Sequence, residues 1–217
     1  MGLLTVAAFS MMLAAPPQGF VDVAEAIPDV QVDARYYGSD NFLGRPVKGY
    51  NAAKAFLSKE AASALTKVQE ELVAKGLALK VFDGYRPQRA VDDFMHWIAD
   101  KSDIKTKAKY YPNISKSQLV PQGYIAEKSG HTRGSTVDLT IVKLSDGAEL
   151  DMGSGWDYLG SISHALTGQV SDEAKKNRAL LRNLMIKHGF KPYDEEWWHF
   201  SLASEPYPNT YFDFVIE

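Results

Sequence analysis

SGHTRGSTVDLTIVKL, residues 129–144, joins a polar turn to the clearest strand pattern of the chain. From Thr136 onwards apolar and polar side chains alternate, as on a β-strand with two distinct faces. His131 precedes Asp138 by seven residues, and Gly134 between them permits a tight turn. Such a turn could fold the imidazole back beside the carboxylate, whose burial without a partner would be costly. We therefore predict that both belong to one site; an exposed strand aspartate is the alternative.

A second imidazole and carboxylate occur near the C-terminus, in Glu196-Trp197-Trp198-His199. On a regular strand Glu196 and His199 would point to opposite faces, so they can serve one site only if the chain turns or bulges at the tryptophans. The tryptophans would then form an apolar wall that excludes water and raises the pKa of the Glu196 carboxyl. A core tryptophan pair beside a surface glutamate is the alternative. The spacing differs from that of the helical HExxH motif.

A guanidinium follows a predicted strand in Asp83-Gly84-Tyr85-Arg86-Pro87. An arginine at a strand end can direct its planar fork at a carboxylate or a developing oxyanion, although an ordinary Arg–Asp pair has the same spacing. Two histidines, one aspartate and an open position make a catalytic zinc site, and a spare glutamate can act as its base. The three stretches therefore predict metal-assisted hydrolysis.

The composition limits the class of protein. The 217 residues are 45% hydrophobic, enough for a sizeable core, and no shift in composition favours two domains. The net charge of -3 gives no bulk attraction to nucleic acid or anionic lipid. The absence of cysteine leaves nitrogen and oxygen as metal ligands.

The N-terminal stretch is apolar and uncharged as far as Phe20. Leu3–Ala15 is too short to span a bilayer as a helix and matches the apolar region of a secretory signal. We expect residues 1–19 to be a leader, residues 20–217 the functional domain, and the protein to be exported to the periplasm without stable membrane insertion. No Lys or Arg precedes the apolar run, so the alternative is a buried N-terminal segment in a cytoplasmic protein.

Hydrophobic periodicity indicates an α+β fold. Helices and short strands do not alternate regularly, which favours a single domain with a central antiparallel or mixed sheet, flanking helices and the metal site at the sheet. Residues 101–128 are polar and read as a long surface loop. Helices are predicted over residues 58–75 and 171–188 and after Pro87, and strands over residues 77–83, 136–144 and 197–202.

These motifs together resemble the zinc D-alanyl-D-alanine dipeptidases of the VanX type, relatives of D-alanyl-D-alanine carboxypeptidases. The resemblance rests on S-x-H-x-x-G-x-x-x-D at residues 129–138, E-W-W-H at 196–199 and D-G-Y-R-P at 83–87, and it extends from about residue 20 to the end. It implies one zinc ion per chain and roles for five residues: His131, Asp138 and His199 as ligands, Glu196 as general base and acid, and Arg86 as stabiliser of the tetrahedral transition state. It also implies substrate-binding positions at Ser129, Asp157 and Tyr36. Gly130 departs from the family pattern, which often has a second serine there.

The activity that the resemblance implies is hydrolysis of the dipeptide D-alanyl-D-alanine. The nearest alternative is a D,D-carboxypeptidase that trims peptidoglycan stem peptides. A non-haem iron oxygenase would need its first histidine and carboxylate two residues apart, whereas His131 and Asp138 are seven apart. A cell-wall binding protein with a silent zinc site is the most distant alternative, because a binder has no need of a base at Glu196.

Overall fold

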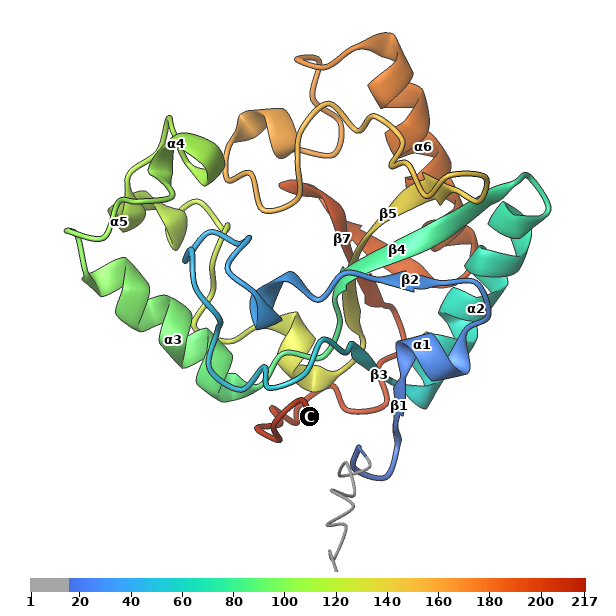
Figure 1. Cartoon of the computed structure of the whole chain (residues 1–217), viewed down its shortest axis with the longest axis horizontal. Coiled ribbons are helices and arrows are strands. Elements are labelled where there is room, and N and C mark those ends of the chain that lie inside the picture. Colours follow the sequence, from blue (N-terminus) through green and yellow to red (C-terminus); the bar gives the residue numbers. More distant parts are fainter. Residues whose placement is uncertain (1–15) are drawn as a thin grey trace, which may run out of the picture.

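A five-stranded mixed sheet forms the centre of the molecule, in the order β2-β4-β5-β7-β6 (Figure 1). The computed structural model describes residues 16–217, so the predicted leader lies almost wholly outside the described residues. The short β2 pairs in parallel with β4, and all other pairs are antiparallel. The strands are β2 (Gln31–Val32), β4 (Leu77–Asp83), β5 (Thr136–Lys143), β6 (Phe190–Tyr193) and β7 (Glu196–Leu202). The predicted α+β fold with a mixed sheet is confirmed.

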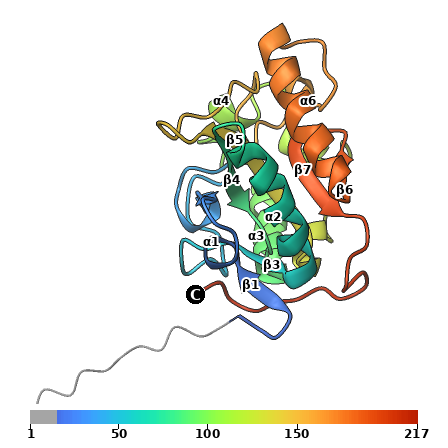
Figure 2. The same ribbon diagram turned by 90° about the vertical axis from the view of Figure 1, so that its right-hand side faces the viewer.

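Helices cover the sheet, and a small second sheet pairs β1 (Phe20–Asp22) with β3 (Phe56–Ser58). Two long helices, α2 (Lys59–Val73) and α6 (Asp172–Lys187), lie side by side against the main sheet (Figure 2). The remaining helices are α1 (Val23–Ala26), α3 (Gln88–Ala99), α4 (Lys107–Tyr110) and α5 (Lys116–Leu119). No helix in residues 16–217 is long and apolar enough to cross a membrane.

Both long helices lie within two residues of the ranges predicted from the sequence, 58–75 and 171–188. The Ser58 hydroxyl accepts a hydrogen bond from the Ala61 amide at the start of α2, and Ser171 accepts one from Ala174 at the start of α6. Gly76 and Gly189 follow the two helices with φ of 73° and 91°, a backbone conformation that glycine adopts without strain.

The strand β5 is more deeply buried than its alternating pattern suggested. Residues 136–142 are buried without exception, so the polar face that carries Asp138 is covered as well as the apolar face. On that polar face Asp138 lines a cavity, and the Thr136 hydroxyl hydrogen-bonds the Ser201 hydroxyl on β7 at 2.7 Å.

Residues 101–128 do not form the predicted surface loop throughout. They contain α4 and α5, and Tyr110, Tyr111 and Leu119 are buried in the core. The Lys116 amine also points inward and donates hydrogen bonds to the carbonyls of Trp97 and Asp100 at the end of α3. The segment is therefore a packed cover over α3, because its aromatic and aliphatic side chains are buried despite its polar composition.

Candidate metal centre and active site

The three predicted ligands come from three adjacent elements. His131 lies in a short 3-10 turn, Gly130–Arg133, whereas Asp138 and His199 are paired residues of the neighbouring strands β5 and β7. Gly134 ends the turn with φ of 82°, and a Cβ there would lie 2.3 Å from the Phe20 ring. The close turn predicted at Gly134 therefore places the loop histidine beside the strand aspartate.

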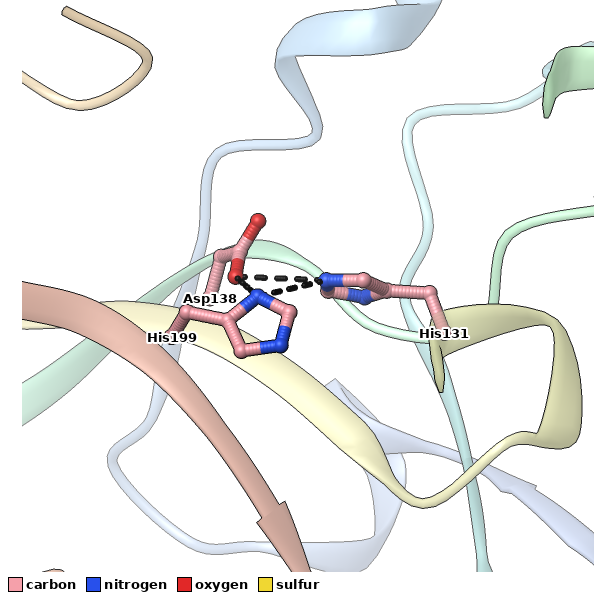
Figure 3. Close-up of side chains that lie close together, drawn as sticks. All are labelled: His131, Asp138 and His199. Atoms are coloured by element: carbon pink, nitrogen blue, oxygen red, sulfur yellow. Dashed lines mark hydrogen bonds and ion pairs between the residues drawn. The ribbon is translucent and has the colours of Figure 1, made fainter. Parts of the chain in front are cut away.

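Their ligand atoms converge on one point (Figure 3). Asp138 Oδ1 lies 3.2 Å from His131 Nε2 and 3.1 Å from His199 Nδ1, and the two nitrogens are 3.3 Å apart. Zinc bound tetrahedrally at its usual ligand distances would separate neighbouring ligand atoms by about 3.3–3.5 Å. The three observed separations, 3.1 to 3.3 Å, lie at or slightly below that range, so the residues fit a zinc ion with only small shifts.

Two further features support a cation at this point. Asp138 Oδ1 is buried, and within residues 16–217 neither of the two histidine nitrogens beside it makes a well-formed hydrogen bond to it, an unusual condition for a carboxylate oxygen. His131 Nδ1 lies 2.7 Å from the Gly84 carbonyl, which fixes the proton on Nδ1 and leaves the Nε2 lone pair free for a metal. Burial alone would raise the pKa of Asp138, but His131 and His199 together hold it far below its ordinary value.

Glu196 lies next to this group of ligands. On β6, Pro192 pairs with Phe200 of β7, but the next residue, Tyr193, pairs with Glu196. The register therefore shifts across residues 197–199 of β7, which confirms the predicted irregularity at the tryptophans. As a result Glu196 Oε2 comes within 3.5 Å of His199 Nδ1. Burial raises the pKa of the Glu196 carboxyl well above its ordinary value, and the charges of Asp138 and Asp157 raise it further.

Arg86 joins the cavity from the end of β4. Its Nε donates to Asp83 Oδ2 at 2.9 Å, and its Nη2 lies 3.7 Å from Asp138 Oδ2. Arg86 thus forms an ion pair with Asp83, which was the alternative to a role in the site, and it also lines the cavity. Tyr50 donates to the other oxygen of Asp83 at 2.7 Å, so the guanidinium is held in one orientation.

The three predicted substrate positions line the same cavity, whose volume is about 240 Å³. Tyr36 Oη donates to Asp157 Oδ2 at 2.7 Å, and both side chains are buried. Burial raises the pKa of Asp157 well above its ordinary value, and the charge of Asp138 adds to the effect. The Ser129 hydroxyl accepts from the His131 amide at 3.3 Å, so it also caps the turn that carries the ligand. Each of the eight predicted site residues therefore faces one cavity.

The rest of the cavity wall was not predicted from the sequence. The segment 123–128 covers it from the side of α5, together with Tyr193 at the end of β6. Trp156 supports the site from outside, because its indole donates to Asp138 Oδ2 at 3.3 Å. The sequence indicated only that the segment 101–128 is long and polar. Those properties do not predict which part of the molecule the segment covers.

Comparison with known proteins gives one consistent result. The family described as D-ala-D-ala dipeptidase (Peptidase M15) matches residues 17–217. The proteins named D-alanyl-D-alanine dipeptidase from Enterococcus faecalis and Streptomyces coelicolor are 43% and 44% identical to the chain, and each match covers 91% of this chain and 98% of the relative. A protein of the same name from Escherichia coli is 34% identical over 84% of this chain and 83% of its own length.

Proposed function

This chain belongs to the D-ala-D-ala dipeptidase family (Peptidase M15), and from that premise we propose that it is a zinc metallopeptidase that hydrolyses D-alanyl-D-alanine to two molecules of D-alanine. One observation carries the proposal. Three mutually adjacent ligand atoms and the carboxyl of Glu196 share a partly open cavity of about 240 Å³, which is below the range of about 300–1,000 Å³ usual for drug-sized ligands. A very small substrate is therefore favoured.

His131, Asp138 and His199 would hold one zinc ion per chain. Bound there, zinc supplies a Lewis acid for the scissile carbonyl and lowers the pKa of a water molecule. Glu196 accepts the proton of the attacking water and delivers it to the leaving amine, which fits a carboxyl with a raised pKa. Arg86 donates hydrogen bonds to the oxygen that gains negative charge in the tetrahedral intermediate.

The ends of the dipeptide are bound, in this proposal, by the other predicted residues. Asp157 pairs with the free ammonium group through a charge-assisted hydrogen bond, and Tyr36 orients its carboxylate. Ser129, two residues before the ligand His131, lines the same cavity, and its hydroxyl binds the substrate carboxylate. At position 130, where the family often has a second serine, this chain has Gly130 and therefore no second hydroxyl.

The cellular setting that we propose is the periplasm, with D-alanyl-D-alanine from peptidoglycan metabolism as the substrate. Its support is the apolar sequence of the predicted leader, residues 1–19. A cytoplasmic enzyme with the same chemistry is the alternative.

Alanine release by purified protein tests the activity directly. We expect turnover of D-alanyl-D-alanine and none of L-alanyl-L-alanine. A chelator should abolish turnover, and added zinc should restore it. Equal cleavage of both stereoisomers, or turnover that survives complete metal removal, would contradict the proposal.

A further inference from the structure

The loop between β5 and α6, residues 151–164, carries two side chains of the site. Asp157 faces the cavity, and the Trp156 indole donates to Asp138. Asp157 has φ of 58°, a conformation that a residue with a side chain keeps only when its surroundings hold it. Tyr36 hydrogen-bonds the Asp157 carboxylate from within the cavity, but the backbone position of Asp157 depends on what holds this loop.

Arg178 on α6 binds this loop through four side-chain hydrogen bonds. Its guanidinium donates to three backbone carbonyls: Nε to Met152 at 2.6 Å, Nη1 to His164 at 2.9 Å and Nη2 to Ile162 at 3.0 Å. It also reaches the Ser154 hydroxyl at 3.4 Å. One side chain thus holds both ends of the loop, with Asp157 between them.

The charge of Arg178 is not explained by ordinary ion pairing. The residue is only 4% exposed and has no salt bridge to a carboxylate in the described part of the chain. Burial lowers the pKa of Arg178 to about 10, so the group stays charged at neutral pH in spite of the burial. Burying a guanidinium is expensive, and helix packing alone would be served by an apolar side chain. The planar fork directs its donors several ways in a fixed geometry, so one guanidinium reaches carbonyls at both ends of the loop.

The loop is also hydrogen-bonded to β7, the strand that carries the proposed base Glu196. Ser154 accepts a hydrogen bond from the Trp197 indole at 3.0 Å, and Trp197 follows Glu196 in β7. Asn177, adjacent to Arg178, donates to the Asp151 carbonyl at 2.9 Å. The first turns of α6 therefore hold the loop against the sheet.

We propose that Arg178 is a positioning residue, which fixes loop 151–164 so that Asp157 meets the ammonium end of the substrate and Trp156 supports Asp138. The part that concerns the substrate rests on the proposed function. Arg178 does not line the cavity, so it acts through the loop and not on the reacting atoms.

The test compares Arg178→Lys with Arg182→Lys, a matched change one turn further along α6 at an arginine whose Nε has no partner in residues 16–217. Lysine keeps the charge but lacks the fork. For Arg178→Lys we expect KM for D-alanyl-D-alanine to rise about tenfold or more with kcat changed only a few-fold. Its preference for the free dipeptide over N-acetyl-D-alanyl-D-alanine should fall by a similar factor. Arg182→Lys should match the wild type in both.

Two further measurements separate positioning from general destabilisation. Combining Arg178→Lys with Asp157→Asn should add little to either change alone, because both act on one contact. Hydrogen exchange of the amides in residues 151–164, measured without substrate, should accelerate in Arg178→Lys and remain as in wild type elsewhere. If Arg178→Lys does not fold, Ser154→Ala should show the same changes to a smaller degree.

The proposal is overturned if both substrates lose rate in equal proportion, or if the loop amides exchange at the wild-type rate. Wild-type protein that cleaves neither substrate would instead reject the proposed function. In that case the exchange measurement alone decides whether Arg178 holds the loop.

Discussion

Three carboxyl groups line the cavity, those of Asp138, Asp157 and Glu196, against two positive side chains, the partly buried Arg86 and the exposed Lys128. Burial and mutual repulsion raise the pKa of Asp157 and Glu196 well above ordinary values. An arrangement with surplus negative charge favours cationic ligands. A divalent metal beside Asp138 and a substrate ammonium beside Asp157 would each offset part of that charge.

Replacing any one of the three ligands should release the metal. His131→Ala, Asp138→Ala and His199→Ala each remove one of three converging donor atoms. We expect zinc in the dialysed variants to fall to a small fraction of the wild-type content, measured by elemental analysis. Glu195→Gln, outside the group of ligands, serves as the control and should keep its zinc. Full occupancy in all three alanine variants would refute the ligand assignment.

Glu196→Gln separates metal binding from proton transfer. The amide fills the same space but cannot accept a proton, so the variant should retain zinc and lose turnover by about 10²–10⁴-fold. Steady-state kinetics beside metal analysis measures both properties. Near-wild-type turnover would mean that the base lies elsewhere, with Glu195 the first residue to examine.

At the scale of elements, the sequence predicted what periodicity and capping control. The long helices α2 and α6 and the strands β4 and β5 were found within a few residues, because each is long enough to repeat its pattern. Helices of four residues, such as α4 and α5, contain about one turn and show no repeat, so the sequence predicts a loop over 101–128 where the structure has two short helices. The irregularity in β7 was inferred from the chemistry and not from periodicity, because Glu196 and His199 had to meet. The covering segment 123–128 depends on tertiary packing, for which no local pattern exists.

The contact between α3 and the loop 38–50 offers a stability test at this scale. Asp93 on α3 accepts two hydrogen bonds from Arg45, at 2.7 and 3.0 Å, and one from the Lys48 amide at 3.2 Å. Arg45 is 38% exposed, which weakens the pair, so Asp93→Asn should lower the free energy of unfolding by about 1–3 kcal/mol. Urea denaturation measures the change, with the exposed Asp92→Asn on the same helix as control.

The same pair predicts a dependence on pH. Burial opposes ionisation of Asp93, but the hydrogen bonds from Arg45 and Lys48 hold its pKa below its ordinary value. A lowered pKa stabilises the folded state above the unfolded pKa of about 3.9, and this contribution disappears as the pH falls through the lower folded value. The stability difference between wild type and Asp93→Asn should therefore be constant above about pH 5 and shrink below about pH 4. A difference that grows on acidification would contradict this assignment.

For the whole molecule, the proposed export depends on residues 1–19 acting as a signal. If they are a signal, protein recovered from the cell envelope should begin near Ala15 to Phe20. N-terminal sequencing of the envelope and cytosolic fractions distinguishes the alternatives. An intact Met1 on a cytosolic pool would contradict export.

The cavity is lined by segments that are far apart in the sequence. Segment 123–128 is held over it by hydrogen bonds from Tyr193 Oη to the Gly123 carbonyl, at 2.9 Å, and between Tyr124 Oη and His164 Nε2, at 3.0 Å. Asp157 stands within the same enclosure. A substrate that fills so small a space has both of its ends inside it, and a longer peptide would have to leave its amine unpaired or displace the cover.

Substrate length should therefore control the rate. A buried partner left unpaired costs about 1–3 kcal/mol, and more when it is charged, so loss of the free amine should slow cleavage about tenfold or more. We expect efficient cleavage of D-alanyl-D-alanine and very poor cleavage of its N-acetyl form and of a pentapeptide that ends in D-alanyl-D-alanine, compared by kcat/KM. Asp157→Asn should narrow the gap between free and acetylated dipeptide, mainly by slowing the free one, because the removed charge has no role toward an acetylated end. Equal rates on dipeptide and pentapeptide in the wild type would favour a D,D-carboxypeptidase, since only a site open at the Asp157 side can admit the longer chain.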